Sequence, residues 1–213
     1  EHVAPTKLIA IENTHNSCGG RALSTSDVNQ IKQIASKNNI PIHLDGARIF
    51  NAAIALENTV EELTKDVDSV QFCLSKGLGA PVGSLVLGEK DFTQKVRKWR
   101  KTIGGTTRQA GILAAAGIVA LNNYEESIKR DHDLAKYMHE KLSEIENITP
   151  EPVETNLVFF NINADNPGEI SKKLKEKGIN GGAETSRWRF VPHYGLTKED
   201  IDYVAETLNE LLN

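Results

Sequence analysis

The sequence predicts an α/β protein followed by a smaller α+β unit, on two observations. In the first half of the chain, short apolar segments of strand length alternate with segments of helical periodicity. This alternation is typical of a sheet whose strands are joined by crossover helices. After Asn122 and Asn123 the pattern changes to one long charged helix followed by two strands and two helices. We therefore expect two domains, residues 1–123 and residues 124–213.

The elements of the first domain follow from local periodicity. The expected strands are residues 6–13, 41–45, 69–74 and 84–87. The expected helices are residues 28–37, 47–56, 60–64 and 109–121, the first of them after a cap-and-turn stretch of Ser, Thr and Asp.

The second domain is predicted from a different pattern. Residues 125–145 form one long, charged amphipathic segment, which is typical of a surface helix. Strands are expected at residues 156–162 and 187–191, and further helices at residues 167–177 and 198–212. This order of elements predicts the small α+β unit.

Composition limits the possible partners. With 213 residues, 39% hydrophobic and 25% charged, the chain is long enough to bury a core and has the balance of an ordinary soluble, cytoplasmic protein. The 25 Lys and Arg residues against 29 Asp and Glu residues give a net charge of -4, which argues against nucleic acid as a partner. The apolar run at residues 112–121 is far shorter than the roughly 20 residues of a membrane span, so no membrane partner is expected.

The two cysteines predict no metal site. Cys18 and Cys73 are far apart and lack the CxxC spacing of zinc ligands, and two such residues do not make a disulfide framework. We expect both to be reduced thiols and expect no bound metal.

Ligands of α/β sheets gather at the carboxyl ends of the strands, where two polar segments stand out. In the first, HLDGAR, Asp45 ends a strand, Gly46 allows a turn, and Arg48 follows. A helix N-cap Asp with a surface Arg remains an alternative explanation of this segment.

Lys76 lies in the second segment, SKGLGAPVG, among Gly, Ala and Pro with almost no competing charge. An amine held in a tight, weakly polar loop would lose part of its hydration, and desolvation favours the neutral amine that Schiff-base chemistry uses. The alternative is an ordinary solvated loop lysine.

Asp45, Arg48 and Lys76 together predict a pyridoxal phosphate site. This cofactor needs a lysine for its Schiff base and an acidic partner that keeps its pyridine nitrogen protonated. Four longer motifs, ENTHN, HLDGARIFNA, SKGLGAPVGS and GGTTRQAGILAAAG, then resemble the threonine aldolase family of fold type I pyridoxal phosphate enzymes. The resemblance runs from His2 to the C-terminus.

The resemblance implies a fold and a reaction. The fold would be the C-terminal part of a fold type I large domain, a mixed, mostly parallel sheet with helices, plus a small α+β C-terminal domain. The reaction would be cleavage of threonine or allo-threonine to glycine and an aldehyde, so the partner is a small amino-acid substrate. The family also implies a homodimer or homotetramer with the active site at a subunit interface.

Roles of single residues follow from the same resemblance. It implies that Lys76 binds the cofactor as its internal aldimine, that Asp45 holds the pyridinium, and that Arg48 lies close to the ring oxygen. Arg108 would reach the cofactor phosphate, across a subunit interface. Without the family, the stretch around Arg108 is explained as a structural glycine turn before a helix.

Substrate contacts are also implied. Arg189, in RWRFVPH, matches the family arginine that holds the substrate carboxylate, and Arg187 is the second candidate. An edge-strand arginine in an ion pair is the alternative for Arg189. His2 and His15 are the candidate catalytic histidines near the substrate hydroxyl, although a lone histidine is more often structural.

One departure from the family pattern limits these expectations. The loop that cradles the cofactor phosphate and the side chain that stacks on the ring are expected upstream of residue 1, in roughly the first third of a family member. The alternatives are therefore another fold type I lyase or aminotransferase, or a non-catalytic remnant that acts in assembly.

Overall fold

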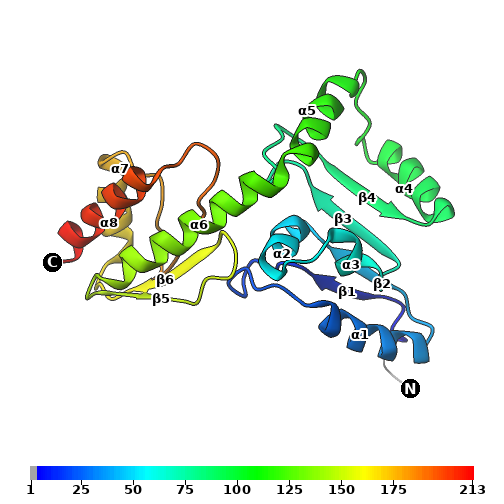
Figure 1. Cartoon of the computed structure of the whole chain (residues 1–213), viewed down its shortest axis with the longest axis horizontal. Coiled ribbons are helices and arrows are strands. Elements are labelled where there is room, and N and C mark those ends of the chain that lie inside the picture. The colour runs from blue at the N-terminus through cyan, green and yellow to red at the C-terminus, as the bar shows by residue number, and fades with distance from the viewer. Residues whose placement is uncertain (1–3) are drawn as a thin grey trace. The chain divides into compact units, whose positions relative to one another are not determined.

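A computed structural model describes residues 4–213 (Figure 1). Contacts divide the chain into two compact units. The first contains the chain up to Thr14 together with Ala22–Glu126, and the second contains His15–Arg21 together with Ser127–Asn213. The loop His15–Arg21, which the sequence grouped with the first domain, thus makes its contacts with the second unit. The limits of the two predicted domains themselves remain a prediction.

The first unit is built on a four-stranded sheet with the order β1-β2-β3-β4. Its strands are β1 (Ile9–Glu12), β2 (Ile42–Asp45), β3 (Ser69–Cys73) and β4 (Ser84–Gly88). The first three run parallel, and β4 pairs antiparallel with β3 (Figure 1). The predicted mixed, mostly parallel sheet is therefore confirmed.

Five helices accompany this sheet: α1 (Thr25–Lys37), α2 (Ile49–Leu56), α3 (Val60–Thr64), α4 (Lys90–Thr102) and α5 (Gly111–Asn122). Capping boxes at Ser24 and Thr59 start α1 and α3, since each hydroxyl accepts a backbone N–H three residues on. Helix α4 was not predicted from the sequence. Its charged residues obscure the spacing of Phe92, Val96 and Trp99, and none of its residues is buried.

Strand β2 separates an apolar face from a polar face. Ile42 and Leu44 are fully buried on one side, whereas His43 and Asp45 point to the other and are half-buried. This alternation follows from the two-residue period of a strand. Asp45 therefore ends β2 on the side away from the apolar core.

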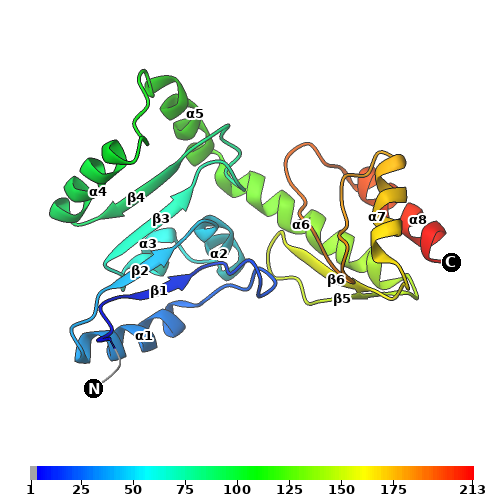
Figure 2. The ribbon, with the colours of Figure 1, turned by 180° about the vertical axis from the view of Figure 1, so that it is seen from behind.

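The second unit is an α+β arrangement on a three-stranded antiparallel sheet, β5-β6-β7 (Figure 2). Its strands are β5 (Ile148–Pro150), β6 (Val158–Ile162) and β7 (Arg187–Phe190), and its helices are α6 (Tyr124–Ser143), α7 (Pro167–Glu176) and α8 (Lys198–Leu212). Phe160 and Trp188 pack edge to face in its core with ring centroids 6.0 Å apart. Only the short strand β5 was missing from the sequence prediction.

Strand β4 and the helices after it expose many large apolar side chains of the first unit. All five residues of β4 are exposed, on both faces of the strand. We call the following set the apolar surface of the first unit: Val82, Leu85, Val86, Leu87, Phe92, Trp99, Ile103, Ile112, Leu113, Ile118 and Val119. Clusters of this kind are typical of surfaces that other protein material covers.

We expect the 213-residue chain, expressed alone, to self-associate through this apolar surface. Replacing Ile103 and Ile112, which are 77% and 79% exposed, by Ser should reduce the association without loss of helix content, because neither side chain is buried. Light scattering after size-exclusion chromatography measures the effect. Ile34→Ser is the matched control, since Ile34 is 61% exposed on α1 outside this surface; an equal effect there would contradict the prediction.

Helix α6 buries two neighbouring ionisable side chains, Asp131 and His132, which are 2% and 4% exposed. Burial raises the pKa of Asp131, although the guanidinium of Arg130 lies 2.8 Å from its carboxylate and acts in the opposite direction. Burial also lowers the pKa of His132 to about 4, assisted by the charge of Lys136. His132 is thus neutral in the folded unit over most of the acidic range.

The contribution of His132 to the stability of the second unit should therefore fall as the pH falls from 6.5 towards 4, whereas the raised pKa of Asp131 acts in the opposite direction. In this window the unfolded chain binds a proton at His132 and the folded chain does not, which costs about 1.4 kcal/mol per pH unit. His132→Leu should flatten the pH dependence of the free energy of unfolding, measured by urea denaturation between pH 7 and pH 4.5. His139→Leu, on the same helix, is the control, and an unchanged slope in His132→Leu would refute the prediction.

Candidate active site

Two of the predicted site residues lie at the same edge of the sheet in the first unit. Asp45 is the last residue of β2, and Lys76 lies in the loop that follows β3. Strands β2 and β3 are neighbours and run parallel, so their carboxyl ends meet at one edge. The structure thus brings a carboxylate and an amine to the edge at which α/β sheets bind ligands.

One oxygen of the Asp45 carboxylate is held and the other is open. Oδ1 accepts the backbone N–H of Ala47 at 3.0 Å and the side-chain N–H of Gln71. Oδ2 accepts no hydrogen bond from any described residue. The N-cap of α2 is Arg48 rather than Asp45, so the alternative explanation of Asp45 as a helix cap does not hold.

Two glycines allow close approaches beside these residues. A Cβ on Gly46 would lie 3.0 Å from the carbonyl oxygen of Gln71, to which the Gly46 N–H donates at 2.8 Å. A Cβ on Gly77 would lie 3.0 Å from Oδ1 of Asn51, a residue of α2 that is 2% exposed. Both contacts are tighter than a larger residue would tolerate without movement of its neighbours.

The loop that carries Lys76 is tightly folded, as the sequence predicted. The Gly79 N–H donates to the carbonyl of Lys76 at 2.8 Å, and Gly79 has a φ of +78°. The Leu74 N–H donates to the carbonyl of Gly83 at 2.9 Å, and the Leu74 carbonyl accepts the N–H of Ala80 at 3.0 Å. The Lys76 side chain itself is exposed, however, so residues of this chain do not provide the desolvation expected for its amine.

Two further predicted cofactor residues belong to the first unit. Arg48 is half-buried directly after the turn that follows Asp45. Arg108 is exposed in the turn before α5, which begins at Gly111 and not at residue 109 as predicted. Gln109, which lies between Arg108 and the start of α5, has a φ of +52°, and this left-handed conformation keeps it out of the helix. The contacts of Arg48 and Arg108 with a cofactor remain predictions.

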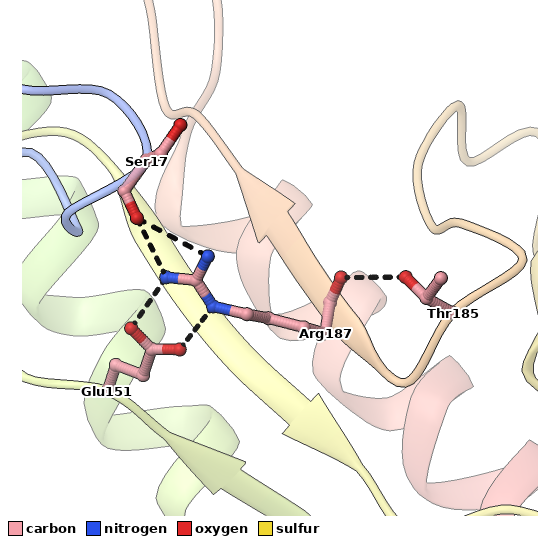
Figure 3. Close-up of polar contacts among 4 residues, drawn as sticks. All are labelled: Ser17, Glu151, Thr185 and Arg187. Atoms are coloured by element: carbon pink, nitrogen blue, oxygen red, sulfur yellow. Dashed lines mark hydrogen bonds and ion pairs between the residues drawn. The ribbon is translucent and has the colours of Figure 1, made fainter.

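In the second unit, Arg187 is fixed by an ion pair (Figure 3). Its Nε and one terminal nitrogen lie 2.6 and 2.9 Å from the two carboxylate oxygens of Glu151, and its guanidinium donates to the carbonyl of Ser17 at 3.4 Å. The guanidinium also stacks 4.1 Å from the ring centroid of Phe159. The hydrogen bond from Arg187 lowers the pKa of Glu151. The carboxylate of Glu151 thus takes the paired N–H groups of the Arg187 guanidinium.

Arg189, two residues further along β7, is differently placed. It is exposed, and its guanidinium donates to the side-chain oxygen of Asn16. No acidic side chain of residues 4–213 lies within 4 Å of it. The ion pair considered as the alternative for Arg189 is therefore found at Arg187, and Arg189 keeps N–H groups that can bind a carboxylate.

Of the two candidate histidines, one can be described. His15 lies in the loop His15–Arg21 of the second unit, the loop that also contributes the contacts of Asn16 and Ser17 to the two arginines of β7. Its Nδ1 accepts the Cys18 N–H at 3.3 Å, so in the neutral ring Nε2 carries the proton. His2 lies outside the described residues.

Sequence analysis missed three side chains that organise these groups: Gln71, Glu151 and Asn16. Gln71 could have been found from strand alternation, which puts it beside Asp45 once the strands pair in register. Glu151 and Asn16 come from parts of the chain 36 and 173 residues away from their arginines, so no local pattern indicates them.

Further searches of residues 4–213 gave negative results. No three His, Cys, Asp or Glu side chains in this range are grouped so that they could hold a metal ion. Cys18 and Cys73 are free thiols. None of the described helices is long and apolar enough to cross a membrane.

The groups at the sheet edge fit the needs of pyridoxal phosphate. Asp45 presents an open carboxylate oxygen that a pyridinium N–H can approach, and the side chain of Lys76 is exposed. An α/β unit with this carboxylate and lysine defines the class of fold type I pyridoxal phosphate enzymes. Within that class, the chain belongs to the beta-eliminating lyase family, whose model matches residues 1–165.

Comparisons with known proteins agree. The chain is 40% identical over 215 residues to low-specificity L-threonine aldolase 1 of Arabidopsis thaliana, with 97% of this chain and 60% of the relative covered. It is 39% identical to the low specificity L-threonine aldolase of Escherichia coli O157:H7, with 96% and 60% covered. The chain thus spans about 60% of the length of these relatives.

Solved structures support the fold. A putative L-allo-threonine aldolase of Listeria monocytogenes matches with a TM-score of 0.82 at 20% identity, covering 98% of this chain and 62% of that one. A threonine aldolase of Leishmania major matches with a TM-score of 0.79 at 17% identity, covering 100% of this chain and 63% of that one. The fold type I architecture predicted from the sequence is confirmed.

The different settings of the two arginines predict different effects of the same substitution. Arg187→Lys loses the two-pronged contact with Glu151 and should destabilise the second unit by about 1 kcal/mol, because the pair is partly exposed. Arg189→Lys should leave stability within about 0.5 kcal/mol of the parent, since it removes no ion pair. Urea denaturation of both variants measures the difference, and equal losses would contradict the assignment of the ion pair.

Proposed function

We propose that this chain carries the lysine-bearing part of a pyridoxal phosphate-dependent aldolase. Its substrates are threonine, allo-threonine or related β-hydroxy-α-amino acids, which it cleaves to glycine and an aldehyde. The observation that carries the proposal is the pair of Asp45 and Lys76 at the ends of neighbouring parallel strands. The names of the relatives, low-specificity L-threonine aldolases, support the choice of substrate.

Pyridoxal phosphate, when bound, supplies an electron sink for the pair released from the breaking Cα–Cβ bond. Lys76 would hold the cofactor through Nζ. Asp45 would accept the ring N–H at Oδ2 and would so keep the proton on the pyridine nitrogen, on which the sink depends. Arg108 and Arg48 add positive charge and N–H donors for the phosphate and the ring oxygen.

The second unit supplies groups for the substrate. The planar fork of Arg189 binds the substrate carboxylate and thereby sets the direction of the bond that breaks. His15 donates from Nε2, which suits it to hold a water that takes the β-hydroxyl proton, and His2 is the other candidate base. Arg187, held by Glu151, supports the loop on which His15 lies.

Assembly and location belong to the same proposal. A homodimer or homotetramer, with Arg108 reaching a neighbouring subunit, is supported by the apolar surface of the first unit, which lies on the elements flanking Arg108. A cytoplasmic location is supported by the composition, with its reduced cysteines and modest net charge.

Two alternatives remain distinguishable. Another fold type I lyase or an aminotransferase would use the same Asp and Lys pair, but a transferase yields a keto acid, whereas the aldolase yields glycine and an aldehyde. A non-catalytic role in assembly is the other alternative, and it predicts neither glycine nor a keto acid as a product.

Borohydride reduction of the full-length protein loaded with pyridoxal phosphate, followed by peptide mapping, tests the proposal. We expect one stable adduct, on Lys76, because borohydride reduces the C=N bond of the lysine Schiff base. Lys76→Arg should abolish the adduct and the release of glycine from threonine. Lys101→Arg, at an exposed position on α4, is the control. An adduct on Lys101 or on any lysine other than Lys76 would contradict the assignment of Lys76.

A further inference from the structure

The polar face of the sheet in the first unit contains two matched side-chain pairs. His43 pairs with Ser69 in the register of β2 and β3, and Asp45 pairs with Gln71. In each pair the side chains meet: Nδ1 of His43 lies 2.9 Å from the hydroxyl of Ser69, and the amide of Gln71 donates to Oδ1 of Asp45. The side chain of Asp45 on β2 is thus held by a side chain of the neighbouring parallel strand β3.

Gln71 has no evident part in the core. Strand alternation puts Gln71 on the face opposite to Val70 and Phe72; Phe72 is buried, whereas Gln71 is half-buried. Its amide makes no other hydrogen bond with a described residue. Its side chain is therefore committed to the carboxylate of Asp45.

The consequence for Asp45 is a fixed orientation. A lone Ala47 N–H on Oδ1 would leave the carboxylate free to rotate about its Cβ–Cγ bond. A second N–H on the same oxygen, from the neighbouring strand, restricts that rotation and leaves Oδ2 as the oxygen without a donor among the described residues. Hydrogen bonds to a carboxylate are charge-assisted and directional, so two of them define a plane.

We propose that Gln71 is a positioning residue for the cofactor: it locks the Asp45 carboxylate so that Oδ2 meets the pyridine N–H in line. The inference rests on the proposed function and adds a residue to it. Gln71 does not touch the ring or the substrate. It acts only through Asp45, and its removal should weaken the hold of Asp45 on the ring proton while Asp45 stays in place.

The test uses the full-length protein loaded with pyridoxal phosphate labelled with ¹⁵N in its ring. The ¹⁵N chemical shift reports directly whether the ring nitrogen is protonated, and it does not depend on turnover. Gln71→Met keeps the length of the side chain and removes the amide. We expect its ring signal to move towards that of a neutral pyridine and its cofactor Kd to rise about fivefold or more, in line with the loss of one hydrogen bond to a charged group.

Four further variants make the test specific. Gln33→Met, the same substitution at an exposed position of α1, should change neither quantity. Asp45→Asn should move the ring signal at least as far as Gln71→Met does. In the Asp45→Asn background, Gln71→Met should change the Kd less than twofold, because a residue that acts through Asp45 has nothing left to position. Gln71→Glu, which replaces the donor by an acceptor, should move the signal in the same direction as Gln71→Met.

The outcomes separate this inference from the proposed function. If Asp45→Asn moves the ring signal and neither Gln71→Met nor Gln71→Glu does, Asp45 is the ring partner and the inference about Gln71 is overturned. If the effects of Gln71→Met and Asp45→Asn are additive, Gln71 acts by another route and the inference again fails. If Asp45→Asn leaves the signal unchanged, the proposed role of Asp45 fails first, and the inference with it.

Discussion

The close pairing of β2 with β3 is the constraint on which the candidate site depends. Gly46 continues β2 by one residue and donates its N–H to the carbonyl of Gln71, at a separation that a side chain on Gly46 would disturb. This contact holds the turn after Asp45 against the neighbouring strand. The carboxylate, the turn to α2 and the start of the Lys76 loop all take their places from that one register.

The two arginines of β7 show that residues of the same type can have different partners two positions apart. Both point to the same side of the strand, since a strand repeats every two residues. Glu151 on the neighbouring segment satisfies Arg187, while Arg189 meets only the neutral side chain of Asn16 among the described residues. The carboxylate of Glu151 thus takes N–H groups of Arg187, whereas Arg189 keeps N–H groups that no described carboxylate takes.

The sequence predicted the strands other than β5, and the residues at their ends, because these depend on local periodicity and on position relative to a strand. It missed α4, where charged residues outnumber apolar ones, and it overestimated the desolvation of Lys76. The Gly and Pro residues around Lys76 indicate a tight loop, but burial depends on what lies above the loop, which local sequence does not specify. Gln71 and Glu151 were missed for a related reason, because their partners are distant in sequence and come close only in the folded protein.

The glycines near Lys76 are required for two different reasons. Gly77 faces Asn51, and there the Cβ of an L residue would lie 3.0 Å from Oδ1 of that buried side chain. Gly79 has no atom within 4 Å of the place a Cβ would take, but its backbone has a φ of +78°. The demand at Gly79 is therefore one of chirality and not of volume: an L side chain there would have room, but it would strain the backbone of the loop that carries the lysine.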